Sequence, residues 1–251
     1  MKAILAALLL LGSPLTTALD TSSAESAPTP YLVPYEADYD TTAMGLGMVL
    51  HRSLETTEAG WLLRNQGSVL IASLKEEARF DVKDNRILGQ HFAYRLKGLV
   101  SRRREVQFDP ERGLIRSLRK KQWSEHSWHP DILDRLSQQE QLRIDLLHAT
   151  TPPKTLTFQV VDGDRVKTRE LALVGTEDIS VPAGRFTTVH YQQVRENANE
   201  RASDIWLAPA LDYLMVRTLH VEDGSDVRVE LRSTTLEPRV GLETAESQGT
   251  H

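Results

Sequence analysis

Alternation of apolar and polar residues is the dominant pattern along the chain from Tyr35 onward. It is clearest around two Asp-Gly pairs, Asp162-Gly163 and Asp223-Gly224, where alternating runs lie on both sides. A two-residue hairpin turn needs positive φ angles, and glycine adopts them at the least steric cost. Each region therefore predicts an antiparallel hairpin with one apolar and one polar face.

Shorter runs fill the first half of the chain and are separated by Gly, Asp and Pro. We expect a turn at Asp84-Asn85, strands over 102–108 and 114–118 around a Pro-containing turn, and one unbroken run over 61–74. Short strands at such spacing are typical of sandwiches, barrels and curved sheets. The sequence predicts a mainly β fold: a curved antiparallel sheet or an open, half-closed β-barrel.

One segment, from Pro130 to His148, departs from this alternation. Its aliphatic residues fall within an arc of roughly 200° on a helical wheel, which predicts an amphipathic helix. Pro152 and Pro153 prevent its continuation. We expect this helix to cover the concave, apolar side of the sheet. The arc consists of Ile132, Leu133, Leu136, Leu142, Ile144, Leu146 and Leu147.

Arg143 lies near the middle of this apolar arc, with Glu140 one turn earlier on the same side. An unpaired buried guanidinium is very costly, so we expect an ion pair or bonds to backbone carbonyl groups. The preferred interpretation is a tether that holds the helix to the sheet. Contact with a ligand is the alternative.

The first eighteen residues have the three zones of a signal peptide. Lys2 supplies a positive start, Ala3–Leu11 is an apolar run, and Thr16-Thr17-Ala18 offers a cleavage site, with Ser22-Ser23-Ala24 as a second candidate. The apolar run has nine residues, whereas a membrane span needs roughly 20. A cleaved signal peptide is therefore favoured over an uncleaved anchor.

The organisation that follows is a signal peptide (1–18), a flexible leader (19–32), one β-rich domain (33–236) and a disordered tail (237–251). Cysteine is absent, which removes disulfides, thiolate chemistry and the lipid-bearing cysteine of a lipoprotein. A mature chain of this size buries roughly 70% of its unfolded surface and needs no disulfides. We predict an exported periplasmic protein that does not span the membrane.

Basic residues are concentrated between Arg95 and Lys121, where ten of them stand against three acidic ones in a chain of formal charge −5. The favoured interpretation is the solvated face of two neighbouring strands. The alternative is a patch that meets an anionic envelope surface, such as phosphate-bearing lipid or acidic glycan. The residues of this candidate patch are Arg102, Arg103, Arg104, Arg119, Lys120 and Lys121.

His126, His129 and Asp131 form a cluster whose spacing does not suit a zinc site, so a loop before the helix is favoured. No G-x-S-x-G, S-x-x-K, Walker-type or G-x-G-x-x-G pattern is present. The sequence therefore supports no catalytic residue, no metal and no cofactor.

Three tryptophans are candidate ligand-binding residues together with Arg143. Trp123 and Trp128 flank the histidine cluster in the expected loop, where they either mark a contact surface or cap the core. Trp206 lies at the end of an expected strand, where packing in the core is the commoner role.

Several short motifs occur in an order that resembles an exported bacterial family. They are Pro34–Tyr39, Asp134–Ser137, Leu142–Leu146, Val181–Phe186 and Ile205–Leu214. Together they resemble the family known as domain of unknown function 3108, over about residues 33–236. The resemblance implies an envelope location, a β-rich fold and no established activity.

The turn Pro182–Phe186 and the later strand Trp206–Pro209 are also similar to those of half-barrel proteins that carry lipids or lipoproteins across the periplasm. This is an analogy of architecture, and fold alone does not determine function. Met215 stands where such a pattern would have a proline.

The leading hypothesis is a non-enzymatic periplasmic protein of envelope assembly or maintenance that carries a lipid-like amphiphile in the concavity of the sheet. The alternative is a structural module that binds anionic envelope components through the basic patch. An envelope hydrolase ranks third. The expected partners are a lipid or another envelope component, or a periplasmic protein, and no nucleic acid.

Overall fold

The computed structural model describes residues 32–43, 46–98, 101–194, 203–222 and 225–239. The expected signal peptide, most of the expected leader and most of the expected tail lie outside these residues. The described elements are fifteen strands and two helices. The strands are β1 (Tyr35–Ala43), β2 (Leu46–Thr57), β3 (Gly60–Val69), β4 (Ala72–Lys83), β5 (Arg86–Lys97), β6 (Arg102–Asp109), β7 (Leu114–Arg119), β8 (Gln122–Ser127), β9 (Ile132–Leu133), β10 (Thr155–Asp162), β11 (Arg165–Val181), β12 (Gly184–Gln193), β13 (Ser203–Ala208), β14 (Leu214–Glu222) and β15 (Ser225–Thr234); the helices are α1 (Ser137–His148) and the short 3-10 helix η1 (Pro209–Leu211).

All of these strands belong to one sheet with the order β8-β7-β6-β5-β4-β3-β2-β1-β15-β14-β13-β12-β11-β10-β9. Neighbours are antiparallel, except that β9 pairs in parallel with β10. Two meanders, β1–β8 and β10–β15, are joined where the first strand pairs with the last. The sheet does not close, because β8 and β9 form its two edges.

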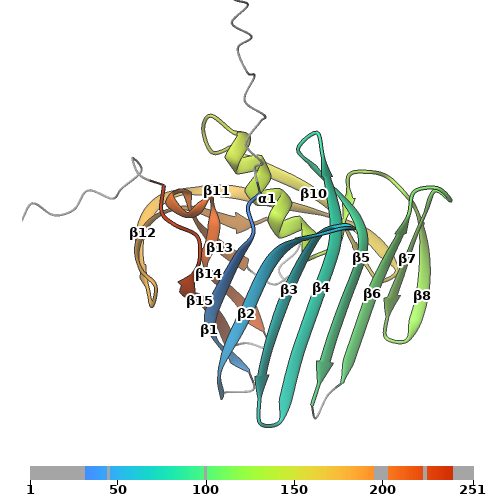
Figure 1. Ribbon diagram of the computed structural model, residues 1–251, viewed down its shortest axis with the longest axis horizontal. Helices are drawn as coiled ribbons and strands as arrows, with labels where there is room; N and C mark the ends of the chain where they lie inside the picture. Colours follow the sequence, from blue (N-terminus) through green and yellow to red (C-terminus); the bar gives the residue numbers. More distant parts are fainter. Residues whose placement is uncertain (1–31, 44–45, 99–100, 195–202, 223–224, 240–251) are drawn as a thin grey trace, which may run out of the picture. The chain divides into compact units, whose positions relative to one another are not determined.

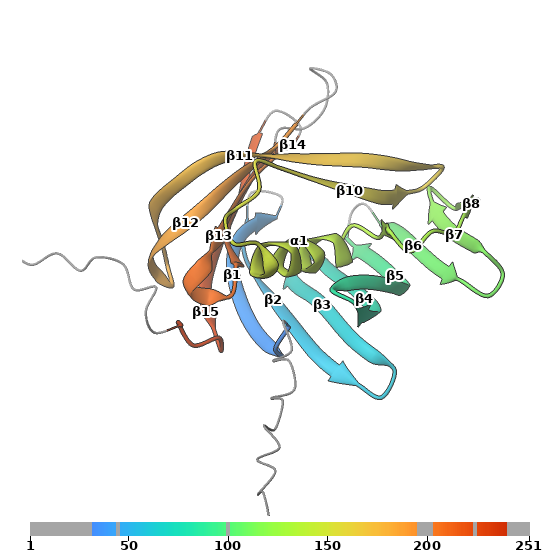
Figure 2. The same cartoon turned by 90° about the horizontal axis from the view of Figure 1, so that it is seen from above.

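The two meanders form two arms with α1 between them, as Figures 1 and 2 show. This confirms the predicted fold class: a mainly β, curved and open antiparallel sheet with one α-helix on its concave side. Side chains of both arms and of α1 form one apolar core, in which each fully buried aliphatic side chain contributes about 1.5–3 kcal/mol. It includes Tyr39, Phe80, Phe92 and Ile115 from the first arm, Val160, Tyr191, Val216 and Leu231 from the second, and Leu142, Ile144 and Leu146 from α1.

The predicted start of the helix at Pro130 is wrong. Ile132 and Leu133 form β9, and α1 begins only at Ser137. The carboxylate of Asp134 accepts hydrogen bonds from the backbone N–H groups of Leu136 and Ser137 at 2.8 and 2.9 Å. These groups have no partner within a helix, so a carboxylate at this place fixes where the helix starts.

The predicted unbroken run over 61–74 is also wrong. Val69 pairs with Ala72, so Leu70 and Ile71 form a two-residue turn between β3 and β4. Two large aliphatic residues give no turn signal, because such turns usually carry Gly, Asn or Asp.

The predicted turns with ordinary turn residues are confirmed. Asp84 and Asn85 join β4 to β5 with φ angles of 49° and 63°. The hairpins β10–β11 and β14–β15 also form where the sequence predicts them. In β10–β11, Asp162 pairs with Arg165, so the two turn residues are Gly163 and Asp164. The turn therefore lies one residue later than the pair Asp162-Gly163 suggests.

Candidate functional site

The outer face of the first arm follows from strand alternation. Leu63, Ala78 and Phe92 point into the core and are buried. Because successive side chains of a strand point to opposite faces, Lys75 and Arg95 lie on the outside of β4 and β5. The same strands therefore build the core and present this outer surface.

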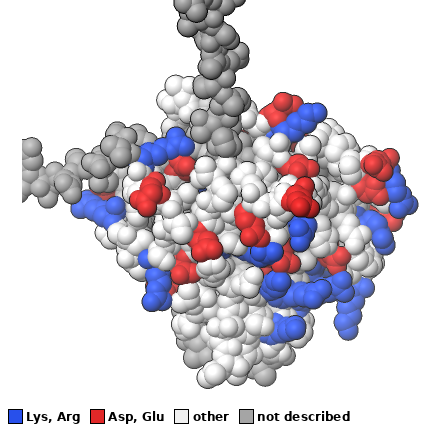
Figure 3. All heavy atoms as spheres, in the orientation of Figure 1, with Lys and Arg blue, Asp and Glu red and all other residues white. Residues whose placement is uncertain are grey.

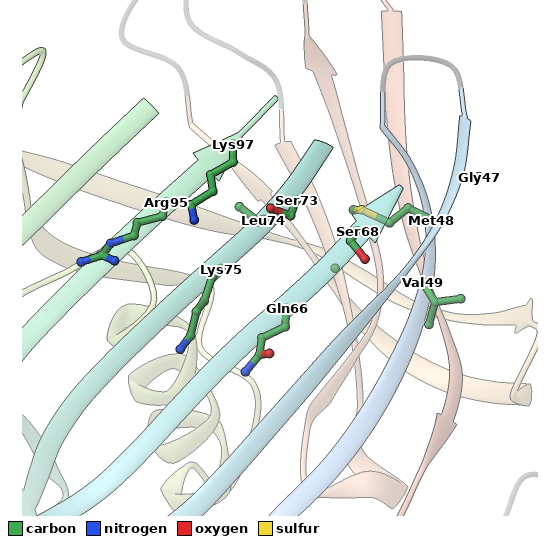
Figure 4. A pocket seen from close by; sticks show the side chains of 11 residues that line it. Gly47, Met48, Val49, Gln66, Ser68, Ser73, Leu74, Lys75, Arg95 and Lys97 are labelled. Atoms are coloured by element: carbon green, nitrogen blue, oxygen red, sulfur yellow. The ribbon is translucent and has the colours of Figure 1, made fainter. Parts of the chain in front are cut away.

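A hollow of about 690 Å³ opens on this outer face near one end of β2–β5 (Figure 4). Lys75, Arg95 and Lys97 line it, together with the neutral side chains of Gln66, Ser68 and Ser73. None of the described residues that line it carries a carboxylate. The hollow therefore presents cations and hydrogen-bonding groups, beside the apolar residues Met48, Val49 and Leu74.

The register of the sheet places three cations in one row across β4, β5 and β6. Lys75 is directly opposite Arg95, and Arg95 is directly opposite Arg103. Like charges in directly opposite positions destabilise a sheet. Lys and Arg gather on this face in Figure 3, whereas the described atoms at its lower end include no blue or red ones.

Carboxylates neutralise the two ends of this row. Nζ of Lys75 lies 3.0 Å from Oε1 of Glu77, and Nη2 of Arg103 lies 2.5 Å from Oε2 of Glu105. Burial alone would raise the pKa of both carboxyl groups, but their cationic and hydrogen-bonding neighbours hold each pKa below its ordinary value. Both carboxylates are therefore ionised at neutral pH.

The middle of the row has no such partner. Within the described part of the chain, no hydrogen bond or ion pair joins the side chain of Arg95 or Lys97 to another residue. Gly47 adds to the space, because a Cβ at this position would meet no atom within 4 Å. The hollow therefore carries uncompensated positive charge and room for an anion.

A second polar cluster lies inside the sheet and is centred on Glu140 of α1. Its carboxylate accepts hydrogen bonds from the Tyr35 hydroxyl (2.8 Å), Arg52 (2.8 Å) and Arg143 (2.7 Å). Arg143 also donates to the carbonyl oxygen of Asp212 at 3.1 Å. The expected ion pair and carbonyl bond of Arg143 are thus confirmed, and they connect α1 to both arms.

Burial and the two guanidinium groups together determine the protonation of this cluster. Burial raises the pKa of the Tyr35 hydroxyl to about 12, so the phenol stays neutral. For Glu140, burial would raise the pKa, but Arg143 and Arg52 hold it below its ordinary value. The cluster thus contains one carboxylate and two guanidinium groups, and Nη2 of Arg143 has no hydrogen-bond partner.

The spaces beside α1 are small. The one next to Glu140 and Arg143 has about 10 Å³, which corresponds to about one water molecule. Another, between α1, β9 and β10, has about 220 Å³. Ligand pockets for drug-sized molecules are usually ~300–1,000 Å³. Both of these spaces beside α1 are therefore smaller than such a pocket.

The predicted basic patch does not lie on one face. Arg103 points away from the side of β6 that carries Arg102 and Arg104, as strand alternation requires. Arg104 and Arg119 both reach Asp162 of the other arm, at 3.4 and 3.0 Å. Lys120 and Lys121 form the exposed turn between β7 and β8, with φ angles of 51° and 66°.

The three candidate tryptophans lie apart from one another. Trp206 is buried, stacks on His190 with ring centroids 4.2 Å apart, and donates to Glu177 at 2.7 Å. Trp123 is exposed beneath the guanidinium of Arg116. Trp128 is partly buried against the core.

The expected loop around the histidine cluster is wrong for its first part, because β8 contains both Trp123 and His126. His126 contacts the Gly163 carbonyl oxygen at 2.9 Å, whereas His129 lies 3.4 Å from Asp131. Within the described residues, no group of three or more His, Cys, Asp or Glu side chains is placed to hold a metal ion.

None of the helices described is long and apolar enough to cross a membrane.

Sequence reasoning missed Lys75, Arg52 and Tyr35 as members of these clusters. Lys75 belongs to the hollow only through its register with Arg95, and Arg52 reaches Glu140 across 88 positions of the chain. No local pattern carries such information. Arg95 and Lys97 do lie within the basic stretch that the sequence singles out.

These features define an open, barrel-like β protein whose core is built around one helix and whose outer face carries a cationic hollow. A profile of the family described as "Protein of unknown function (DUF3108)" matches residues 63–232. The match covers more than half of the chain, so the chain belongs to this family, as the motifs of the sequence predicted.

Among solved structures, the chain is similar to a protein from Brucella abortus described as a "Beta-barrel-like Protein of Domain of Unknown Function DUF1849". The TM-score is 0.53 with 11% identity, over 83% of this chain and 99% of the other. At this identity the similarity concerns the fold. A search of curated proteins found no match.

Proposed function

We propose that this chain is a non-enzymatic binding protein of the bacterial cell envelope that recognises phosphate-bearing, anionic groups at the hollow on its outer face. The observation that carries the proposal is the row of Lys75, Arg95 and Arg103, in which Arg95 has no partner among the described residues. A bound anion would relieve the repulsion within this row. The envelope location rests on the signal-peptide pattern of the sequence.

The chemistry of the lining favours phosphate among anions. Arg95 offers a planar set of N–H donors that binds phosphate in a bidentate manner, and Lys97 adds a compact charge. Ser68 and Ser73 offer hydroxyl groups at the same hollow. A phosphate ester of glycerol fits this mixture, because the phosphate can bind the charged donors and the glycerol hydroxyl groups can bind the neutral ones.

An amphiphile carried inside the sheet has less support. The described spaces of about 10 and 220 Å³ beside α1 fall below the usual size of a ligand pocket. The outer hollow is larger, at about 690 Å³. The favoured mode is therefore the binding of anionic envelope components at the outer surface, through residues that only partly coincide with the basic patch.

The test uses dihexanoyl phosphatidylglycerol, below its micelle concentration, as a soluble anionic probe. We expect the native chain to bind it, and the double variant Arg95→Glu/Lys97→Glu to bind at least about tenfold more weakly, because two charged contacts are reversed. Isothermal calorimetry measures the affinity. Dihexanoyl phosphatidylcholine, which has no net charge, serves as the control ligand.

The matched control variant is Arg79→Glu/Lys83→Glu, which makes the same change of net charge at exposed positions of β4 outside the hollow. It should keep the affinity of the native chain. An equal loss in both variants, or no binding of the probe by the native chain, would show that the hollow is not the recognition site.

A further inference from the structure

The turn between β3 and β4 exposes two large aliphatic side chains. Leu70 is fully exposed (103%) and Ile71 is half exposed (49%). Both occupy the central positions of a two-residue turn, where small or polar residues are usual. In water these side chains add nothing to the apolar core of the described domain, so their placement needs another explanation.

A further apolar side chain lies near this turn among the described residues. Val49 on β2, which lines the hollow, is 41% exposed. Gly98, the residue after β5, lies close to the turn, because a Cβ at this position would be only 2.8 Å from the carbonyl oxygen of Ile71. The β3–β4 turn lies at the lower end of the view in Figure 1, and in the same orientation the described atoms at the lower end of Figure 3 belong to no Lys, Arg, Asp or Glu.

The cations of the hollow lie a short distance from the exposed turn, along β4 and β5 toward the middle of the sheet. Lys97 is paired in register with Ser73, and Arg95 with Lys75. At about 3.3 Å per residue, these pairs are about 7 and 13 Å along β4 from Ile71. Long Lys and Arg side chains extend toward charged groups while their stems lie along apolar surface.

We propose that this end of the sheet docks on the surface of an anionic phospholipid bilayer. Leu70 and Ile71 enter the interfacial region of the lipids, and the cations of the hollow contact lipid phosphates. The proposal rests on the proposed function, because Arg95 and Lys97 serve in both, and it identifies the anionic component as a bilayer lipid.

The dimensions suit a bilayer. Apolar groups of surface-bound proteins enter the boundary between headgroups and acyl chains by ~5–10 Å, and basic residues near an anionic leaflet add to the affinity. A partner protein would require roughly 1,000 Å² of complementary surface with both signs of charge at its rim. Two aliphatic side chains bordered by cations match a lipid surface better.

The first measurement is vesicle co-sedimentation with equal parts of phosphatidylglycerol and phosphatidylcholine, compared with phosphatidylcholine alone. The native chain should bind the anionic vesicles. We expect Leu70→Ser/Ile71→Ser to lower the partition coefficient by about tenfold or more, because the apolar contribution is removed. The same variant should keep its affinity for soluble dihexanoyl phosphatidylglycerol.

The second measurement reports the position of the turn directly. The chain has no cysteine, so Leu70→Cys creates a single site for a polarity-sensitive fluorophore. On anionic vesicles its emission should shift to the blue, whereas a label at Glu111→Cys, at the opposite end of the sheet, should not change. Glu111 lies in the exposed turn between β6 and β7.

The two proposals fail in different ways. If vesicle-bound protein shows no shift at position 70, or if Leu70→Ser/Ile71→Ser binds vesicles as the native chain does, the docking proposal is wrong. If the fluorophore enters the bilayer while Arg95→Glu/Lys97→Glu leaves the binding of the soluble probe unchanged, docking stands and the proposed headgroup recognition is wrong.

Discussion

Glu140 is a carboxylate without exposed surface that connects three elements of the fold. Tyr35 of β1, Arg52 of β2 and Arg143 of α1 all donate to it. Moving charged groups out of water is costly, and the ion pairs and hydrogen bonds to Glu140 offset this cost, although Nη2 of Arg143 keeps no partner. The network therefore holds α1 in one position, and its integrity depends on each partner.

Replacing Glu140 by glutamine should destabilise the protein by about 3–5 kcal/mol, since two buried guanidinium groups then lose their counter-charge. Urea unfolding followed by circular dichroism measures the change. Glu125→Gln is the control, because Glu125 is exposed and lies 3.7 Å from its partner Arg116; we expect a change of about 0–1 kcal/mol there. A cost at Glu140 no larger than that at Glu125 would contradict this account.

The pH dependence of stability provides a second readout of the same substitution. The pKa of Glu140 is lower in the folded chain than in the unfolded one, so the folded state binds fewer protons. The stability that the ionised Glu140 contributes is fully present above its pKa in the unfolded chain, about 4.3. This stability is lost as the pH falls through its lower pKa in the folded chain. The difference in stability between the native chain and Glu140→Gln should therefore narrow below about pH 4.

At the scale of elements, α1 shows how one residue determines a boundary. Asp134 accepts from the backbone N–H groups of Leu136 and Ser137, and from the Ser137 hydroxyl at 2.6 Å. Burial raises the pKa of Asp134, and these hydrogen bonds only partly oppose the effect. The hydrogen bonds at the start of the helix thus offset only part of the cost of burying this carboxyl group.

Asp134→Ala should lower the stability by about 1–2 kcal/mol, because the first N–H groups of α1 lose their acceptor. Hydrogen exchange of the amides of Leu136 and Ser137 should become faster than that of the amides in the middle of the helix. Ser137→Ala is the matched control, since it removes one of the three bonds to Asp134 and leaves both backbone bonds. Equal exchange in the two variants would show that the carboxyl group of Asp134 does not hold the start of the helix.

At the scale of the whole described sheet, its two ends meet through side chains instead of backbone pairing. Asp162 at the end of β10 lies 3.0 Å from Arg119 and 3.4 Å from Arg104. The Gly163 carbonyl oxygen accepts from the Ser117 hydroxyl and contacts His126. These contacts hold the two arms together around α1 where the ladder of hydrogen bonds is interrupted.

Asp162→Asn should weaken this connection and destabilise the protein by about 1–3 kcal/mol, since charge-assisted hydrogen bonds become neutral ones. Amides of β8 and β10 should exchange faster, whereas those of β1 and β15 in the middle of the sheet should not. Asp164→Asn, at an exposed neighbour 3.6 Å from Arg165, is the control. If both substitutions have the same effect, the arms are held together by other contacts.

Much of the fold could be predicted from local patterns. Asp84-Asn85 and the alternating residues around Gly163 indicate turns and strands because the steric preferences of the backbone act over a few residues. The turn at Leu70-Ile71 could not be predicted in this way. Leu70 and Ile71 are large aliphatic residues, so they give the same pattern as the interior of a strand.

The sequence by itself determined the β class, most turns, the presence of one helix, the family and the need of Arg143 for an ion pair or carbonyl partner. Only the tertiary structure decided that β1 lies beside β15, that the helix starts at Ser137, and that Arg95 lies between Lys75 and Arg103. The physical reason is distance along the chain. Local sterics determine how each strand alternates, whereas register between strands depends on burial of the whole core.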